Sequence, residues 1–186
     1  MASEKVMRGL CIVLVLGFCG VVSTTANAAI YNHNGNWVDV DYWAGSGSNE
    51  AVVVVDFYAT GGDSYAFGFK WDGVATGYDA LTAIDAEGNL YFEATNYGDM
   101  GYYIDNFHYN GESGNRSYYW QYFTSSDGGV WDSSMIGMSA RILTDGDWDG
   151  WYNGFDPGVS PTTPVPEPLT IALLGLGGLF LRKRTA

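Results

Sequence analysis

The chain is short of cysteine and of positive charge, and each shortage excludes a class of function. Its 186 residues hold 2 cysteines, Cys11 and Cys19, both within the first 28 residues. If that segment is removed, the remaining protein can form no disulfide and can carry out no thiol chemistry. Lys and Arg together number 8 against 21 Asp and Glu, which gives a net charge of −13.

The stretch from residue 29 to residue 160 is more acidic than the whole chain. Its only basic residues are Lys70, Arg116 and Arg141, against 19 acidic residues, so its net charge is −16. Because nucleic acids are bound by clustered Lys and Arg, we expect no nucleic-acid partner. Cations, neutral sugars or another small neutral ligand suit such a surface better, although the charge alone would also keep an exported protein dispersed.

Both apolar runs of the chain, at 10–22 and 169–181, are 13 residues long. A stable membrane span needs roughly 20 residues. The first run follows Lys5 and Arg8 and precedes Ala26-Asn27-Ala28, a small-x-small cleavage pattern. Residues 1–28 are therefore predicted to be a secretory signal helix that signal peptidase removes.

The second apolar run lies between two further motifs. Before it stand Val165, Pro166, Glu167 and Pro168, and after it stand Arg182, Lys183 and Arg184. This order resembles the sorting tail of PEP-CTERM proteins, which bacteria export and an exosortase processes. The resemblance covers only the tail, and it implies an exported protein of the cell envelope or extracellular matrix. The short run itself predicts a transient membrane anchor helix with its basic end in the cytoplasm.

Proline is scarce except in front of this tail. Of the 5 prolines, four lie between residues 161 and 168. They predict a stiff, extended linker that contains the Pro-Glu-Pro motif. The chain is thus expected to consist of a signal peptide (1–28), one domain (29–160), a linker (161–168) and a membrane and sorting segment (169–186).

The composition of the domain predicts β structure. Aromatic residues favour strands, and the 26 glycines of the chain favour turns. We expect a mostly β, sandwich-like fold of antiparallel sheets with one short α-helix at 78–85. Gly61-Gly62-Asp63 is predicted to join two strands into a hairpin. The predicted strands span residues 37–43, 51–58, 64–71, 90–95, 102–109, 117–123 and 139–143.

The order of short motifs in the domain resembles the transcobalamin-type C-terminal domain of exported bacterial proteins. The matching segments are the valine run 52–55, Asp79-Ala80-Leu81, Gly101-Tyr102-Tyr103-Ile104, Tyr119-Trp120-Gln121-Tyr122 and Asp145-Gly146-Asp147-Trp148. An Asn-Gly pair that usually follows the fourth motif is absent here. The resemblance implies a small α+β domain with a cobalamin-like or protein ligand, and a pocket lined by Trp120 and its neighbours.

The segment 145–156 carries the spacing of a calcium-binding loop. Asp145, Asp147 and Asp149 occupy its first, third and fifth positions, and Asp156 falls at the twelfth. Alternate carboxylates around a glycine turn supply the hard oxygens that Ca²⁺ prefers. The twelfth position is Asp rather than the bidentate Glu, however, and no helix is expected on either side. The alternative is a plain turn beside an aromatic strand.

Tryptophan and tyrosine offer a second kind of site. The chain has 7 Trp and 14 Tyr, and exposed rings beside polar groups can stack on neutral sugars. The alternative is that the rings form the core. Tyr65, Phe67, Phe69 and Trp71 alternate along one strand and are expected to be buried. Trp131, Trp148 and Trp151 lie in Gly- and Asp-rich segments and are the predicted surface candidates.

A catalytic role has little support in the sequence. After residue 28 the chain contains His33 and His108 and no cysteine, and neither histidine has an evident nucleophile partner. A pair of carboxylates for glycoside cleavage remains open, because the domain has many acids. We therefore expect a non-enzymatic structural or binding module associated with exopolysaccharide. The alternatives are a small-ligand, cobalamin-like binder and a glycoside-cleaving enzyme.

Overall fold

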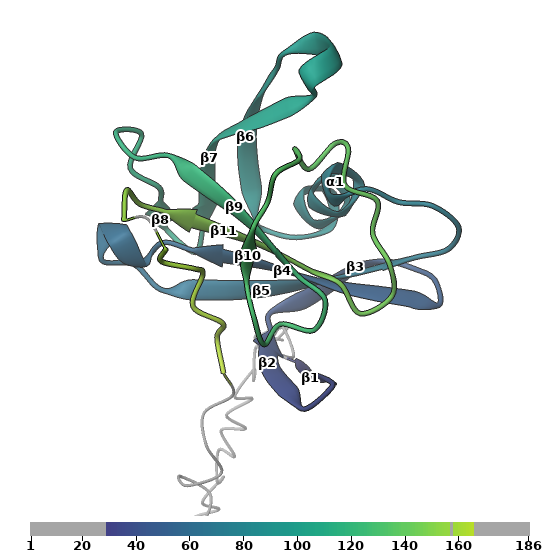
Figure 1. The fold of residues 1–186 in the computed structure, drawn as a ribbon. Helices are drawn as coiled ribbons and strands as arrows, with labels where there is room; N and C mark the ends of the chain where they lie inside the picture. The colour runs from purple at the N-terminus through teal and green to yellow at the C-terminus, as the bar shows by residue number, and fades with distance from the viewer. Residues whose placement is uncertain (1–28, 157, 166–186) are drawn as a thin grey trace, which may run out of the picture.

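The computed structural model describes residues 29–156 and 158–165. The predicted signal peptide, the Pro-Glu-Pro motif and the predicted anchor with its basic end lie outside the described residues. The described part is mostly β with one α-helix (Figure 1), which confirms the coarse prediction of the fold class. None of the helices within 29–156 and 158–165 is long and apolar enough to cross a bilayer.

The strands form a central sheet and two smaller ones. A six-stranded sheet has the order β10-β9-β11-β4-β5-β3, β1 pairs with β2, and β6, β7 and β8 form a third sheet. The element bounds are β1 Ala29–His33, β2 Asn36–Val40, β3 Tyr42–Gly45, β4 Asn49–Asp56, η1 Tyr58–Thr60, β5 Ser64–Trp71, α1 Gly77–Glu87, β6 Tyr91–Asn96, η2 Gly98–Met100, β7 Tyr102–Tyr109, β8 Glu112–Ser113, β9 Trp120–Ser125, β10 Asp132–Ser133 and β11 Trp148–Asn153.

The central sheet is mixed, which corrects the expectation of antiparallel sheets throughout. β11 runs parallel to β4, and β3 runs parallel to β5, while the other pairs in this sheet are antiparallel. The predicted hairpin is present as β4 and β5, joined through η1 and the turn 61–63. β11 reaches its central place next to β4 only from the far end of the domain, so local sequence could not reveal this pairing.

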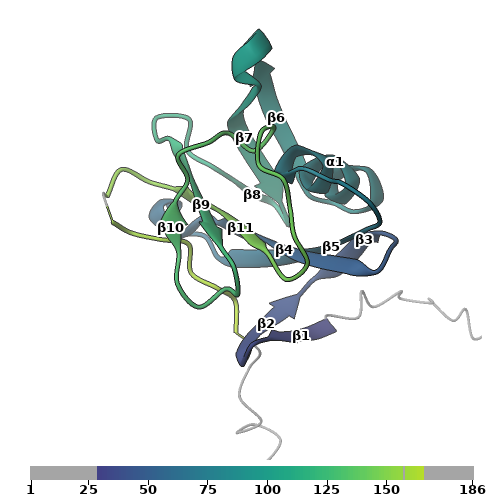
Figure 2. The same ribbon diagram turned by 45° about the vertical axis from the view of Figure 1, so that its right-hand side comes forward.

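Both faces of the central sheet are covered. On one face lie α1 and the three-stranded sheet, and on the other lies the β1–β2 hairpin (Figures 1 and 2). The valines of β4 alternate between these faces: Val53 and Val55 belong to the larger core, and Val52 and Val54 belong to the smaller one. A strand buried on both sides needs an unbroken apolar run, which explains the four consecutive valines.

Local sequence sets the helix accurately. Thr76 caps α1 by accepting a hydrogen bond from the Asp79 backbone N–H, and the Asp79 carboxylate accepts one in return from the Thr76 N–H at 2.8 Å. This capping box satisfies two of the free N–H groups at the helix start. Leu81 and Ile84, which lie on one face of α1, are fully buried, as their spacing predicts.

The predicted strand at 139–143 is absent. Instead the Arg141 carbonyl accepts from the Gly77 N–H at 3.1 Å, and the Leu143 N–H donates to the Ala75 carbonyl at 2.9 Å. The segment therefore joins the start of α1 rather than a sheet, and only an isolated bridge pairs Ile142 with Thr76.

The chain after β11 returns along the domain and packs against it. Pro161 is buried, the Pro164 carbonyl accepts from the Asp39 N–H at 2.9 Å, and the Thr162 N–H donates to Asp56 Oδ2 at 2.6 Å. We call residues 158–165 the strap. The first four residues of the predicted linker thus belong to the packed domain, because β2 and β4 offer hydrogen-bonding partners to them.

Candidate functional site

A groove lined by aromatic side chains lies between β7, β9, β11 and the segment that follows β10. It has a volume of about 390 Å³. A neighbouring hollow of the same volume shares Tyr102, Tyr103 and Gly137 with it and extends towards the tip of the β6–β7 hairpin at Tyr97 and Met100. We call these two hollows together the aromatic groove. Its large rings come from Tyr102, Tyr103, Trp120, Tyr122 and Trp151.

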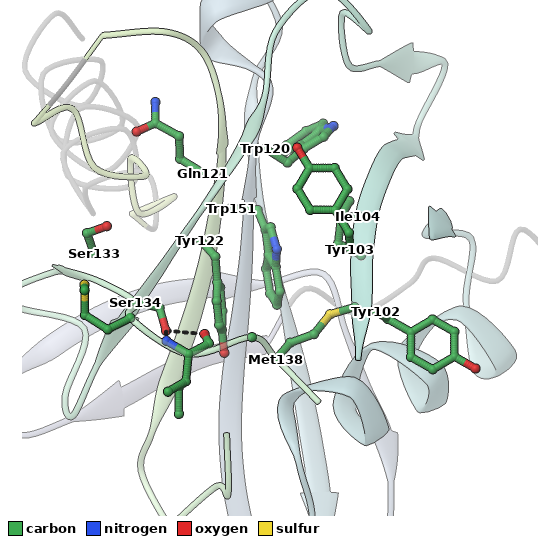
Figure 3. A pocket seen from close by; sticks show the side chains of 13 residues that line it. Tyr102, Tyr103, Ile104, Trp120, Gln121, Tyr122, Ser133, Ser134, Met138 and Trp151 are labelled. Carbon is green, nitrogen blue, oxygen red and sulfur yellow. Dashed lines mark hydrogen bonds between the residues drawn. The ribbon is translucent and has the colours of Figure 1, made fainter. Parts of the chain in front are cut away.

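Strand register explains why the rings meet. Tyr122 on β9 is the direct partner of Trp151 on β11, so their side chains project from the same face. The two rings stack with centroids 4.7 Å apart and planes inclined by 20° (Figure 3). Phe107 on β7 packs edge-on against both Trp120 and Trp151, at 4.8 and 5.6 Å. The back of the groove is therefore continuous with the main core.

Polar groups in the groove are neutral. Gln121, Ser133 and Ser134 line it, and Ser134 is engaged with the backbone of Ile136 at 2.7 and 3.3 Å. Trp120 donates its indole N–H to Asn106 at 3.2 Å. No Asp, Glu, Lys, Arg or His is among the described residues that line the groove. A neutral surface in so acidic a domain favours an uncharged ligand.

The accessible rings are at the rim. Tyr103 is 42% exposed and Tyr97 is 54% exposed, whereas Trp120 and Trp151 are 6% and 2% exposed. Met135 and Ile136 also line the groove and add exposed apolar side chains, with exposures of 96% and 51%. A ligand in the groove would therefore contact the exposed tyrosines far more than the two tryptophans, which are almost completely buried.

A charged cluster lies directly behind Tyr122. The Tyr122 hydroxyl donates to Asp149 Oδ2 at 2.8 Å, and the other oxygen of Asp149 accepts from Arg141 Nε at 2.6 Å. Arg141 also reaches Asp147 at 3.2 Å. Burial raises the pKa of Asp149 to about 6, although Arg141 and Tyr122 act in the opposite direction. Burial, and then the negative charge of Asp149, raise the pKa of the Tyr122 phenol.

The expectation that Trp148 and Trp151 are surface residues is wrong. Trp148 is fully buried in the smaller core beneath the β1–β2 hairpin, and Trp151 is 2% exposed in the larger one. Both lie on β11, a central strand covered on each face, so alternate side chains enter opposite cores. Trp131 is partly buried and packs edge-on against Trp148 at 6.3 Å. Trp120 is among the residues that line the aromatic groove.

The four carboxylates of the predicted calcium loop do not come together. Asp147 and Asp149 are bound to Arg141, and Asp145 Oδ1 accepts from the Glu50 N–H at 2.8 Å. Asp156 lies beyond the other end of β11, about 20 Å along an extended strand. In the described ranges, no group of three or more His, Cys, Asp or Glu is placed to hold a metal ion. The turn beside an aromatic strand, the alternative to the loop, is what forms.

Sequence reasoning missed several aromatic residues that the fold gathers. Tyr58, Tyr118 and Phe155 are distant in the sequence but line one small pocket with Tyr152. No local signal marks them, because they meet only when η1, β9 and β11 come to one edge of the sheet.

Comparison with protein-family models and with curated proteins identified no relative of this chain. No protein-family model matches the chain, and no curated protein matches it.

Proposed function

We propose that the protein is an exported, non-enzymatic binding module of the cell envelope or extracellular matrix. An exosortase would process its PEP-CTERM-like tail, and the aromatic groove would bind a neutral segment of exopolysaccharide. The observation that carries the ligand proposal is the lining of the groove. Rings stand beside hydroxyl groups there, and the described lining holds no charged side chain.

Neutral sugars suit this surface for physical reasons. A sugar ring has an apolar face that packs on a tyrosine or tryptophan ring, and its hydroxyls pair with neutral groups such as the hydroxyls of Ser133 and Tyr103. A charged polysaccharide would instead need opposite charge in the groove to offset the loss of its hydration. The acidic surface around the groove would repel polyanions. Glycoside cleavage is not supported at this place, because a carboxylate pair is required for it.

The ligand proposal can be tested by glycan-array binding of the full chain. We expect neutral glycans among the bound set, and we expect Tyr103→Ala to weaken their binding about tenfold, since one stacked ring contributes on the order of 1 kcal/mol. Trp37→Ala removes an exposed ring on β2, outside the groove, and is the matched control. Equal loss in both variants, or binding confined to charged glycans, would contradict the proposal.

The export proposal has a separate test. In an exosortase-containing host, the secreted protein should lack residues 1–28 and the apolar tail by intact mass. Replacement of Pro166, Glu167 and Pro168 by alanine should leave the tail attached. A full-length protein retained in the cytosol would contradict export, whatever the groove binds.

A small neutral ligand is the second candidate, favoured by the pocket that Trp120 lines. The transcobalamin-type resemblance makes cobalamin the first compound to titrate. Saturable binding that Tyr103→Ala weakens and Trp37→Ala does not would support this candidate over the polysaccharide. Absence of binding at millimolar concentration would remove it.

A further inference from the structure

A second pocket, separate from the aromatic groove, lies at one edge of the central sheet. It is lined by Tyr58, Ala59, Tyr118, Tyr152, Phe155 and Asp156, and its volume is about 320 Å³. It shares no lining residue with the aromatic groove. We call it the edge pocket.

Sheet topology explains why these residues meet. β4 and β11 are parallel neighbours, so the residues that follow them emerge at the same edge, where Asp56 pairs with Tyr152. β9 is antiparallel to β11 and begins opposite its end, with Trp120 paired to Asn153. Tyr58 follows β4, Phe155 and Asp156 follow β11, and Tyr118 precedes β9. This edge lies at the left of Figure 1.

The rings of the edge pocket are held in place but remain accessible. Phe155 packs edge-on against Tyr118 and Tyr119, with centroids 5.1 and 5.5 Å away. Phe155 is nevertheless 56% exposed and Tyr58 is 70% exposed. The backbone supports this arrangement, because the Gly154 N–H donates to the Tyr119 carbonyl at 3.2 Å and the Tyr58 N–H donates to Asp56 at 2.7 Å. Tyr152 is buried and forms the floor.

The electrostatic environment of the edge pocket is negative. Asp156 is exposed at its rim, and no Lys or Arg is among its lining residues. Burial, and then the negative charges of Asp156 and Asp56, raise the pKa of the Tyr152 hydroxyl. Aromatic faces carry partial negative charge, and several rings around one point attract ammonium groups that approach within about 6 Å of the ring centres. The net charge of −16 over residues 29–160 adds a long-range attraction for cations.

We propose that the edge pocket binds an organic ammonium ion, with the rings of Tyr58, Tyr118, Tyr152 and Phe155 and the carboxylate of Asp156 as its binding groups. Its volume of about 320 Å³ can hold an ammonium group with its substituents. A neutral sugar would gain little from Asp156, whereas an ammonium ion uses both the carboxylate and the rings. This inference does not depend on the aromatic groove or on its ligand.

Calorimetric titration of the full chain at constant ionic strength tests the proposal. Choline is the probe, and 3,3-dimethylbutanol, which has the same shape without the charge, is its control. We expect saturable choline binding at least about tenfold tighter than that of the neutral compound, a difference of about 1.4 kcal/mol. Equal affinity for the two compounds, or no choline binding at millimolar concentration, would overturn the proposal.

Two variants locate the site without endangering the fold. Asp156→Asn keeps the shape of an exposed side chain, and Phe155→Leu keeps apolar bulk but removes the ring. Each should weaken choline binding about tenfold. The matched controls are Asp99→Asn on η2 and Trp37→Leu on β2, both exposed and away from this edge. Equal loss in Asp156→Asn and Asp99→Asn would assign the effect to net charge alone, and equal loss in Phe155→Leu and Trp37→Leu would show that the ring at 155 is not the binding group; either result would overturn the site.

Glucosamine oligomers distinguish the source of the ammonium group. Tighter binding of choline than of the oligomers would assign a free quaternary ammonium ligand. Tighter binding of the oligomers would assign the amines of a polysaccharide. Binding of N-acetylated oligomers as tightly as the free amines would overturn a role for charge.

Discussion

The Arg141 side chain forms salt bridges with two carboxylates, those of Asp147 and Asp149. It is one of three basic residues between 29 and 160, and it contacts Asp147 and Asp149, of which Asp149 is 1% exposed. Gly77 makes the close approach possible, because a Cβ there would lie 2.5 Å from Asp149 Oδ2. The cluster ties β11 to the start of α1 and supports Tyr122 in the aromatic groove.

Replacement of Arg141 by methionine should be strongly destabilising. It leaves Asp149 and Asp147 without their cation in a buried place, and breaking a buried pair costs about 3–5 kcal/mol. Urea denaturation measures the loss in the free energy of unfolding. Arg116→Met is the control: its side chain is 61% exposed in its pair with Glu93, so its replacement should lower the free energy of unfolding far less. Equal costs for the two variants would contradict the described burial.

Gly68 on β5 lies beneath the ring of Trp43. A Cβ at this position would be 2.1 Å from Trp43 Cδ2, so Gly68→Ala must displace the ring. The same ring lies under Lys70, whose Nζ is 4.8 Å from the ring centroid. We expect a loss of about 1–3 kcal/mol in the free energy of unfolding. Gly137→Ala, where the nearest atom is 3.8 Å away, should change it far less. A harmless Gly68→Ala would mean that the indole is not packed there.

At the scale of elements, the strap is the segment whose role the structure changes most. Proline composition favours an extended linker that projects from the domain, yet residues 161–164 pack on it. Thr162 bonds with Asp56 at the end of β4, and its carbonyl accepts from the Ser64 hydroxyl. Pro161 lies close to Gly150, where a Cβ would be 2.8 Å from Pro161 Cγ. The strap thus closes over β11.

Two truncations test the strap. Removal of residues 166–186 should leave the melting temperature of the domain unchanged. Removal of residues 161–186 should lower the free energy of unfolding by about 2–4 kcal/mol, because a buried proline and several hydrogen bonds are lost together. Thermal melting of the two shortened chains measures the difference. Identical melting of both would show that the strap contributes nothing.

At the scale of the whole molecule, the net negative charge and the burial of carboxyl groups both lower the stability as the pH rises. Burial is the first cause that raises the pKa of Asp41, Asp56, Asp85 and Asp149. An acid whose pKa is higher in the folded state binds more protons there than in the unfolded chain. Stability from these groups is therefore lost as the pH rises through their folded pKa. The net negative charge also grows over this range and adds self-repulsion.

The protein should accordingly be more stable at pH 5 than at pH 7.5. Asp149, with a folded pKa of about 6, accounts for about 1.4 kcal/mol of this difference, because the rest of its effect is lost below pH 5. Melting curves across this range measure the effect, and 1 M NaCl separates the screened repulsion from the buried carboxylates. Asp149→Asn should flatten the profile near pH 6. A stability that rises between pH 5 and pH 7.5 would contradict the assignment.

Local sequence was sufficient wherever neighbouring residues decide the structure. The alternation at 64–71 predicted β5 and its buried rings, and the spacing of Leu81 and Ile84 predicted α1, because the faces of strands and helices depend on residues a few positions apart. The motifs at both ends of the chain are also local, and the interpretation of their roles rests on sequence alone. The same reasoning failed for Trp148 and Trp151, since burial depends on which strands become neighbours.

Tertiary structure alone decided what lies together. The parallel pairing of β4 with β11 buried two tryptophans, turned the apparent calcium loop into a strand and gave Arg141 its carboxylates. It also gathered Tyr58, Tyr118 and Phe155 at one edge. Residues almost 100 positions apart meet there, and no periodicity within a single segment encodes such a meeting. The free energy that selects it comes from burying both faces of the central sheet at once.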